Sequence, residues 1–283
     1  MKVIQSIQNM QALTDELQSQ GKTVGFVPTM GYFHEGHLSL MRLAAKKADV
    51  VVISIFVNPT QFGPGEDFEK YPRDFNRDTQ LAEDNGVDMI FYPDQKEMYP
   101  EGFLTTVEVD KITRVLCGIS RPHHFQGVTT VCAKLFNIVK PDFAVFGQKD
   151  FQQSVVIKRM VEDMNFDIDI ITAPIIRESD GLAMSSRNTY LSDAERKDAL
   201  SLNNSLFKAQ DMVQKGEKST EVLHNFIKNK ISEKKHTRID YISIVHPETL
   251  QPLDLIKDKA LIALAVFVGK TRLIDNVLIE INQ

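Results

Sequence analysis

Short runs of β-branched and aromatic residues alternate with helical patterns along the first two-thirds of the chain. The run at 50–57 is apolar at nearly every position, as expected of a strand that is buried on both faces. Strands are predicted at 24–27, 50–57, 87–92, 143–146 and 168–171, and helices at 38–48, 74–85, 128–139 and 151–163. This alternation predicts an α/β fold with a doubly wound parallel sheet covered by helices.

The pattern changes after Pro174. Ser192 and Glu195 have the spacing of a capping box, which predicts the start of a long helix, and a second helix is predicted at 221–234. Three further strands are predicted close together, at 238–244, 260–268 and 276–281. We therefore expect two domains, residues 1–176 and a smaller α+β domain at residues 177–283.

Composition and charge narrow the class of protein. The length of 283 residues fits about two domains of ~150 residues, and the net charge of −5 speaks against a broad nucleic-acid-binding face. The longest apolar run, at 260–268, is far shorter than the ~18 residues that a membrane span needs, and the first residues turn polar at once. Cys117 and Cys132 form no C-x-x-C pair. We expect a cytoplasmic protein with packed, reduced thiols.

The segment 28–37, between the first strand and its helix, carries the most informative chemistry. Phosphates favour helix N-termini at the carboxyl ends of parallel strands. Gly31 and Gly36 allow the backbone to come close to a polyphosphate. His34 and His37 are three residues apart at the helix start, so both imidazoles can point at one anion. This arrangement predicts a phosphate-binding site.

Other types of site fit the same segment less well. A metal site built on the H-x-x-H pair lacks a third ligand at suitable spacing, and we expect no resident metal. The chain also contains neither a G-x-x-x-x-G-K-[ST] P-loop nor a G-x-G-x-x-G dinucleotide fingerprint.

Five motifs carry a family resemblance. The H-x-G-H turn at 34–37 is similar to the signature of the nucleotidylyl transferase superfamily, which includes class I aminoacyl-tRNA synthetases, and residues 184–188 resemble its Ser-rich loop. The motifs V-P-T-M-G-x-x-H-x-G-H, S-I-F-V-N-P-x-Q-F, R-P-x-H-F-x-G-V, F-G-x-K-D-x-Q-Q and D-G-L-A-M-S-S-R-N-x-Y-L occur in this order between Val27 and Leu191. Together they resemble the pantothenate synthetase (pantoate–β-alanine ligase) family.

The resemblance implies a two-step reaction. ATP adenylylates the carboxylate of (R)-pantoate and releases pyrophosphate, and the amine of β-alanine then attacks the pantoyl adenylate to give pantothenate and AMP. It also implies a homodimer, with a Rossmann-like first domain that binds ATP and pantoate and a second domain that closes over the active site. Mg²⁺ would accompany ATP as its usual counterion.

The residues that the resemblance assigns to ATP lie in three segments and at the separate position Ile176. His34 and His37 are expected to be catalytic, and the resemblance gives His37 the acid role, in which it can protonate or hydrogen-bond a phosphate oxygen in either protonation state. Lys149 lies in a second strand-to-helix turn where its charge can reach a phosphate. The ATP contacts implied are Met30, Gly31, Tyr32, Phe33, His34, Glu35, Gly36, His37, Gly147, Gln148, Lys149, Asp150, Ile176, Met184, Ser185, Ser186 and Arg187. Of these, Arg187 can grip a phosphate with two hydrogen bonds.

Neutral amides are assigned to the acid substrate. Gln61 follows the long apolar strand, and Gln153 lies one helical turn after Lys149, so both can face one cleft. The resemblance assigns both to pantoate, and Gln61 also to β-alanine. Our hypothesis is that amides fix the carboxylate without the tight salt bridge that would make it a poorer nucleophile. Asp150 and Asp78 are candidates for contacting Mg²⁺.

Three other functions are compatible with parts of this pattern. The chain could be a different H-x-G-H nucleotidylyl transferase, although the glutamine pair and the segment at 180–188 argue against it. A tRNA-charging enzyme would need a basic docking region, which the net charge of −5 disfavours. A nucleotide-sensing module would bind ATP without turnover.

Overall fold

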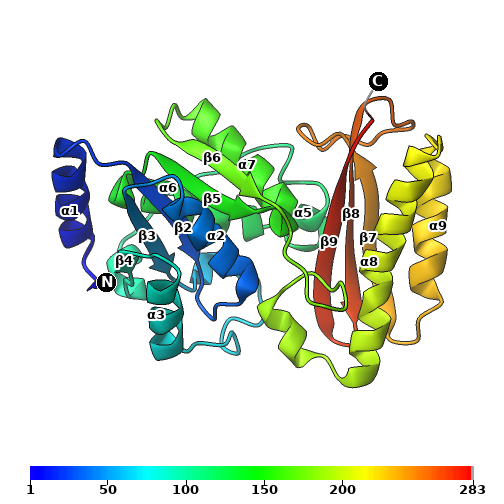
Figure 1. The fold of residues 1–283 in the computed structure, drawn as a ribbon, viewed down its shortest axis with the longest axis horizontal. Helices are drawn as coiled ribbons and strands as arrows, with labels where there is room; N and C mark the ends of the chain where they lie inside the picture. Colours follow the sequence, from blue (N-terminus) through cyan, green and yellow to red (C-terminus); the bar gives the residue numbers. More distant parts are fainter. Residues whose placement is uncertain (282–283) are drawn as a thin grey trace.

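The first domain is built on a parallel sheet. In the computed structural model, which describes residues 1–281, six strands lie in the order β1-β4-β3-β2-β5-β6, and all neighbours are parallel (Figure 1). The strands are β1 (Lys2–Ile4), β2 (Val24–Thr29), β3 (Val50–Ile55), β4 (Met89–Phe91), β5 (Phe143–Gly147) and β6 (Asp169–Ala173). The predicted doubly wound α/β fold is confirmed.

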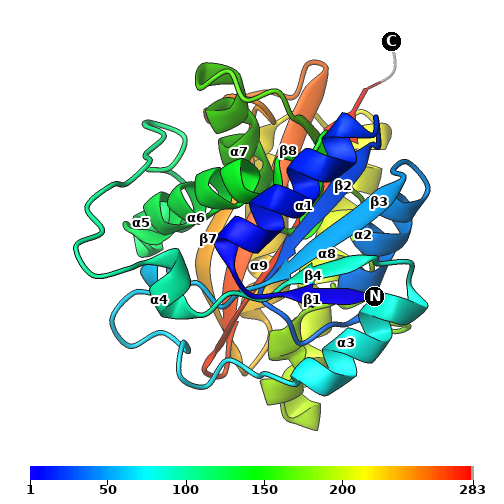
Figure 2. The same ribbon diagram turned by 90° about the vertical axis from the view of Figure 1, so that its left-hand side faces the viewer.

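Helices cover both faces of this sheet. The helices of this domain are α1 (Ile7–Ser19), α2 (Glu35–Ala45), α3 (Phe75–Asp84), α4 (Gln95–Met98), α5 (Cys117–Ser120), α6 (His124–Val139) and α7 (Phe151–Asp163), and the five long ones pack on the sheet. Alternate strand residues enter two cores, since Phe26 packs with α1, α6 and α7 whereas Val27 packs with α2 and α3. Figure 2 shows these two groups of helices on opposite faces of the sheet. Burial on both faces explains why these strands are apolar throughout.

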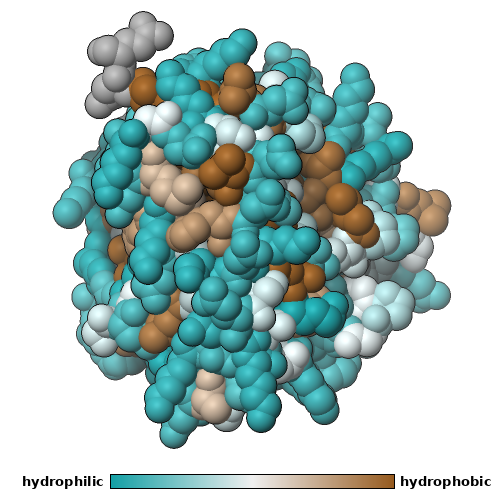
Figure 3. All heavy atoms as spheres, turned by 90° about the vertical axis from the view of Figure 1, so that its right-hand side faces the viewer, coloured by the Kyte–Doolittle hydropathy of each residue, from teal (hydrophilic) through white to brown (hydrophobic). Residues whose placement is uncertain are grey.

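The second domain is a three-stranded antiparallel sheet under two helices. Its elements are α8 (Asp193–Gln214), α9 (Thr220–Ser232), β7 (Thr237–Val245), β8 (Lys259–Val268) and β9 (Thr271–Glu280). The capping box is present, because Ser192 accepts a hydrogen bond from the Glu195 amide while Glu195 accepts one from the Ser192 amide. The outer face formed by α8 and α9 is mainly hydrophilic (Figure 3).

Three short 3-10 helices carry several of the predicted site residues; two lie in the first domain, and the third lies after the boundary expected at residue 177. They are η1 (Pro59–Gln61), η2 (Gln148–Asp150) and η3 (Ser186–Tyr190). The second sheet lies beside the β5–β6 side of the first, and β9 contacts η2 (Figure 1). Our proposed boundary at residue 177 lies just after β6.

Some elements differ from the sequence prediction. β9 begins at Thr271 and not at 276, because its polar first half is paired with β8 and its charged residues find partners inside the protein. The sequence pattern does not predict β1 or α1; β1 has only three residues, and α1 buries only Met10 and Thr14. Within residues 1–281, no helix is both long enough and apolar enough to span a membrane.

Candidate active site

The carboxyl ends of the central strands open onto a cavity that contains most of the predicted residues. Parallel strands end at the same edge, so side chains from distant segments meet there. The predicted residues that line it are Met30, His34, Gly36, His37, Gln61, Gly147, Lys149, Asp150, Gln153, Ile176, Met184 and Arg187. A second cavity adjoins it, toward the second sheet, and shares Lys149, Asp150, Gln153 and Arg187 with it.

The two histidines are fixed by the backbone at the start of α2. His34 is the N-cap, and its Nδ1 accepts a hydrogen bond from the Gly36 amide at 3.2 Å. The Nδ1 of His37 accepts one from the His34 amide at 3.4 Å, and the two ring centroids are 4.1 Å apart. Because each Nδ1 is an acceptor, the proton of each neutral ring is on Nε2. Each imidazole therefore has one N–H donor left for a ligand.

Burial keeps both imidazoles uncharged. It lowers the pKa of His34 to about 4, with a further contribution from the nearby Lys149 ammonium. The pKa of His37 is lowered well below 6.5, first by burial and then by His34 and Lys149. The low pKa makes the His37 ring neutral at pH 7, so that its one proton, on Nε2, is available to donate a hydrogen bond.

Gly36 is needed for the capping geometry itself. A Cβ at this position would lie 2.9 Å from Nδ1 of His34, closer than side-chain atoms normally approach. Any other residue would push the His34 ring away from the amide that it accepts from. The glycine in H-x-G-H is therefore required for the position of the His34 imidazole.

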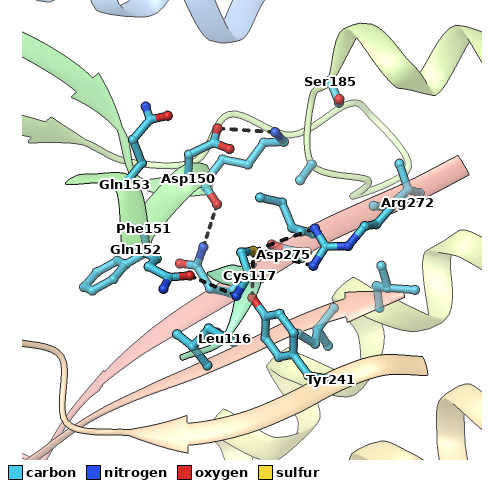
Figure 4. Close-up of a pocket in the computed structure, with 18 of the residues that line it drawn as sticks. Leu116, Cys117, Asp150, Phe151, Gln152, Gln153, Ser185, Tyr241, Arg272 and Asp275 are labelled. Atoms are coloured by element: carbon cyan, nitrogen blue, oxygen red, sulfur yellow. Dashed lines mark hydrogen bonds and ion pairs between the residues drawn. The ribbon is translucent and has the colours of Figure 1, made fainter. Parts of the chain in front are cut away.

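Lys149 and Asp150 lie side by side at the end of β5. The Lys149 Nζ is 3.4 Å from Oδ2 of Asp150, whose side chain is 49% exposed. Burial raises the pKa of Asp150, but the Lys149 ammonium and the Arg187 guanidinium outweigh it and keep that pKa below its usual value. Figure 4 shows Asp150 and Gln153 on one wall of the adjoining cavity, with Tyr241 and Arg272 of the second sheet opposite. The site therefore holds an ammonium beside a carboxylate.

Gln61 is fixed in the turn after β3. The Asn58 Nδ2 donates to Gln61 Oε1 at 3.2 Å, and Gln61 Nε2 lies 3.3 Å from the sulfur of Met30. Helix α6 approaches this turn so closely that a Cβ on Gly127 would lie 2.4 Å from the Thr60 carbonyl oxygen. The glycine of the motif R-P-x-H-F-x-G-V is therefore required for this contact.

Arg187 reaches the cavity but is already paired. Its Nε and an Nη donate to the two carboxylate oxygens of Asp67, at 2.9 and 2.8 Å. The same surface loop pairs Glu66 with Arg121, at 2.7 Å for both hydrogen bonds. Acidic residues of this loop thus neutralise two arginines at the cavity. The sequence does not show these pairs, because the partners are far apart in the chain.

Arg121 and His124 line the cavity although the sequence analysis did not select them as site residues. The signal was the R-P-x-H-F-x-G-V motif, which contains both. The Nδ1 of His124 donates to the Gln61 carbonyl oxygen at 2.9 Å, which leaves Nε2 as an acceptor. Burial and the Arg121 charge lower the pKa of His124 to about 4, so this ring is neutral as well.

Several predicted ATP contacts lie outside this cavity. The Phe33 side chain is 1% exposed and belongs to the core, and Glu35 pairs with Arg42 on the surface. Gln148 turns toward the second sheet and donates to Asn276. Other predicted contacts line only neighbouring cavities, namely Gly31, Tyr32, Ser185 and Ser186.

Asp78 has a structural role in place of the metal contact considered above. Its carboxylate is 1% exposed, and its two oxygens accept hydrogen bonds from the amides of Tyr32 and Phe33 at 2.6 and 2.8 Å. Burial raises its pKa, while these two hydrogen bonds oppose the shift. Asp78 therefore holds the turn that leads into His34. Among residues 1–281, no three His, Cys, Asp or Glu side chains are grouped so that they could hold a metal ion.

Comparison with known proteins identifies the family. The family model described as pantoate-beta-alanine ligase matches residues 2–278. The chain is 56% identical to a pantothenate synthetase of Caldicellulosiruptor bescii, covering 99% of each chain, and 57% identical to one of Thermoanaerobacter pseudethanolicus, covering 98% of each.

Solved structures agree with this comparison over nearly the whole chain. The crystal structure of pantothenate synthetase from Thermus thermophilus superimposes with a TM-score of 0.93 at 44% identity, covering 98% of this chain and 99% of the other. A pantoate-β-alanine ligase from Francisella tularensis, complexed with beta-gamma ATP and β-alanine, gives a TM-score of 0.79 at 35% identity, covering 98% and 97%.

The low pKa of His34 predicts a specific pH dependence. Because its pKa is about 4 in the folded protein and 6.5 ordinarily, the unfolded chain binds more protons between these values. The contribution of His34 to stability is therefore complete above pH 6.5 and is lost as the pH falls toward 4. An NMR titration should show an Nε2–H imidazole at pH 6, and titration near 6.5 would contradict the capped geometry.

Asp78→Asn should loosen the histidine turn. The new amide group would place a donor against a backbone N–H, and one lost buried hydrogen bond costs about 1–3 kcal/mol. Urea unfolding should show this loss, and imidazole ¹⁵N spectra should show mixed tautomers for His34. Asp74→Asn is the matched control, since Asp74 caps α3 through the Arg77 amide and does not contact the turn. Equal imidazole spectra for both variants would argue against the role of Asp78.

Proposed function

Because the chain belongs to the pantoate–β-alanine ligase family, it condenses (R)-pantoate with β-alanine at the expense of ATP, and we propose that His34, His37 and Lys149 bind the phosphates of ATP in this reaction. The observation that carries the proposal is that two neutral imidazoles and an ammonium line one cavity at the ends of β2 and β5. Two hydrogen-bond donors and one positive charge suit a polyphosphate, which is negatively charged and accepts hydrogen bonds.

In the first step, a carboxylate oxygen of pantoate attacks the α-phosphorus of ATP, and the bond to pyrophosphate breaks. Negative charge grows on the phosphate oxygens, and fixed donors that face them lower the barrier; removing one such donor typically costs about 10²–10³ in rate. The backbone fixes the orientation of the Nε2–H groups of His34 and His37. In this proposal both neutral rings donate hydrogen bonds without transferring the Nε2 proton. Lys149 adds a full positive charge.

Gln61 and Gln153 suit the acid substrate. Both line the cavity, and Gln61 is fixed by Asn58. Neutral amides can hold a hydroxyl and a carboxylate while leaving the carboxylate nucleophilic. Val128 and Val131 of α6 line the same cavity and offer an apolar wall to the methyl groups of pantoate. We propose that these residues select a branched hydroxy acid.

In the second step, the amine of β-alanine attacks the carbonyl carbon of the pantoyl adenylate. The new C–N bond forms, the C–O bond to the phosphate breaks, and AMP leaves. We propose that Gln61 also contacts β-alanine. Ile176, Met184 and Gly147 line the same cavity as the catalytic groups and are proposed to contact the nucleotide.

Asp150 is the residue that fits Mg²⁺ bound to ATP. Its carboxylate is charged, half-exposed and at the cavity wall, and Mg²⁺ commonly uses one or two carboxylates together with phosphate oxygens and water. Asp78 does not fit, because both its oxygens accept from the backbone. The ion would neutralise phosphate charge.

The assembly and location are proposals that rest on the family. We propose a homodimer in the cytoplasm, in which residues 1–176 bind ATP and pantoate and residues 177–283 close over them. The two free cysteines are buried, as expected for a protein kept reduced. Sedimentation equilibrium would report the oligomeric state.

His37→Ala and Lys149→Ala should each lower adenylate formation by at least about tenfold, since each removes a donor to the phosphates. The measurement is pantoate-dependent exchange of pyrophosphate into ATP, with AMP and not ADP as the product of the full reaction. Lys158→Ala is the control, because Lys158 is exposed on α7. Full exchange in both site variants, or exchange without pantoate, would contradict the proposal.

Gln153→Ala should mainly raise the KM for pantoate, by about tenfold if it loses hydrogen bonds worth about 1.4 kcal/mol. The KM for ATP and the folded state should change little. Steady-state kinetics with each substrate varied in turn measure this difference. A selective effect on ATP would place Gln153 against the nucleotide instead.

A further inference from the structure

A side chain of the second sheet holds the turn that carries Lys149. Asn276 lies on β9 and is 3% exposed. Its Nδ2 donates to the carbonyl oxygens of Gln148 and Lys149, both at 3.0 Å. Its Oδ1 accepts from Nε2 of Gln148 at 3.3 Å. One amide thus makes three hydrogen bonds with η2 across the boundary between the domains.

Asn276 is itself held firmly. In the sheet Asn276 pairs with Ala263 of β8, and its backbone N–H donates to Oδ1 of Asp275 at 2.8 Å. The Asp275 carboxylate, 2% exposed, is paired with Arg177 at 2.7 Å. Figure 4 shows Asp275 on the second-sheet side of the adjoining cavity, across from Asp150. The side-chain amide of Asn276 therefore extends from a strand that is fixed by its pairing with β8 and by the Asp275–Arg177 ion pair.

The turn η2 has little local support. It follows Gly147 directly, and neither η2 nor the start of α7 has a side chain that caps it. A catalytic group gains most from its position, and a displacement of about 1 Å can cost about 10²-fold in rate. Contacts from outside the turn must therefore fix where the Lys149 ammonium lies.

We propose that Asn276 is a positioning residue for the adenylylation step and that it acts by fixing the backbone of Lys149. The inference rests on the proposed role of Lys149 in binding phosphate. The second domain then contributes to the first chemical step through a residue that does not touch substrate.

A double-mutant cycle tests this inference. Asn276→Ala should lower kcat for pantoate-dependent pyrophosphate exchange by about tenfold, because the Lys149 turn loses its outside hydrogen bonds. In the Lys149→Ala background the same change should have less than about a twofold effect, since two residues that act through one group are not additive. A purely structural residue would give the same factor in both backgrounds.

Two control variants separate positioning from stability. Ser120→Ala removes a different hydrogen bond across the domain boundary, from Ser120 Oγ to Asp240, and should keep kcat within about twofold. Ile279→Val, in the core of the second sheet, should cost about 0.5–1.5 kcal/mol in stability with kcat unchanged. If Asn276→Ala fails to fold, Asn276→Ser takes its place in the same cycle.

The outcomes are distinct. A wild-type kcat for the Asn276 variant, or an equal loss with and without Lys149, would overturn the inference while leaving the proposed function intact. A wild-type kcat for Lys149→Ala alone would instead overturn the phosphate-binding role of Lys149. A loss that disappears in the Lys149→Ala background supports the inference.

Discussion

The geometry of the candidate site depends on two hydrogen bonds at the start of α2, in which imidazole nitrogens accept from backbone amides. His34 and His37 each use Nδ1 as an acceptor, so each ring must present an N–H on Nε2. Their burial prevents protonation near neutral pH. Because the same contacts that start the helix also fix the tautomer, folding of this turn leaves two N–H donors facing the cavity, as the proposed binding of phosphate requires.

The remaining parts of the site are fixed by direct hydrogen bonds from residues that are far away in the sequence. Asp78 of α3 holds the turn before His34, Asn276 of β9 holds the turn of Lys149, and Asp67 pairs with Arg187. In each case a polar side chain that looks available in the sequence is engaged with the protein. The cavity is therefore lined by groups whose positions are fixed, and both domains contribute to that.

Local patterns in the sequence predicted the fold and selected most of the candidate residues that share one cavity. The apolar strands, the Ser192 capping box and the H-x-G-H turn each depend on residues close together in the chain. The roles of Asp78 and Asn276, and the pairing of Arg187 with Asp67, depend on contacts between segments far apart, which one sequence does not show. The polar start of β9 escaped prediction for the same reason, since Arg272 and Asp275 have distant partners.

The most direct test is a crystal structure of the protein with pantoate and a non-hydrolysable ATP analogue. We expect Nε2 of His34, Nε2 of His37 and Nζ of Lys149 to lie within ~3.2 Å of phosphate oxygens, with each histidine Nδ1 still accepting from the backbone. Phosphates bound elsewhere, or imidazoles that rotate to present Nδ1, would contradict it.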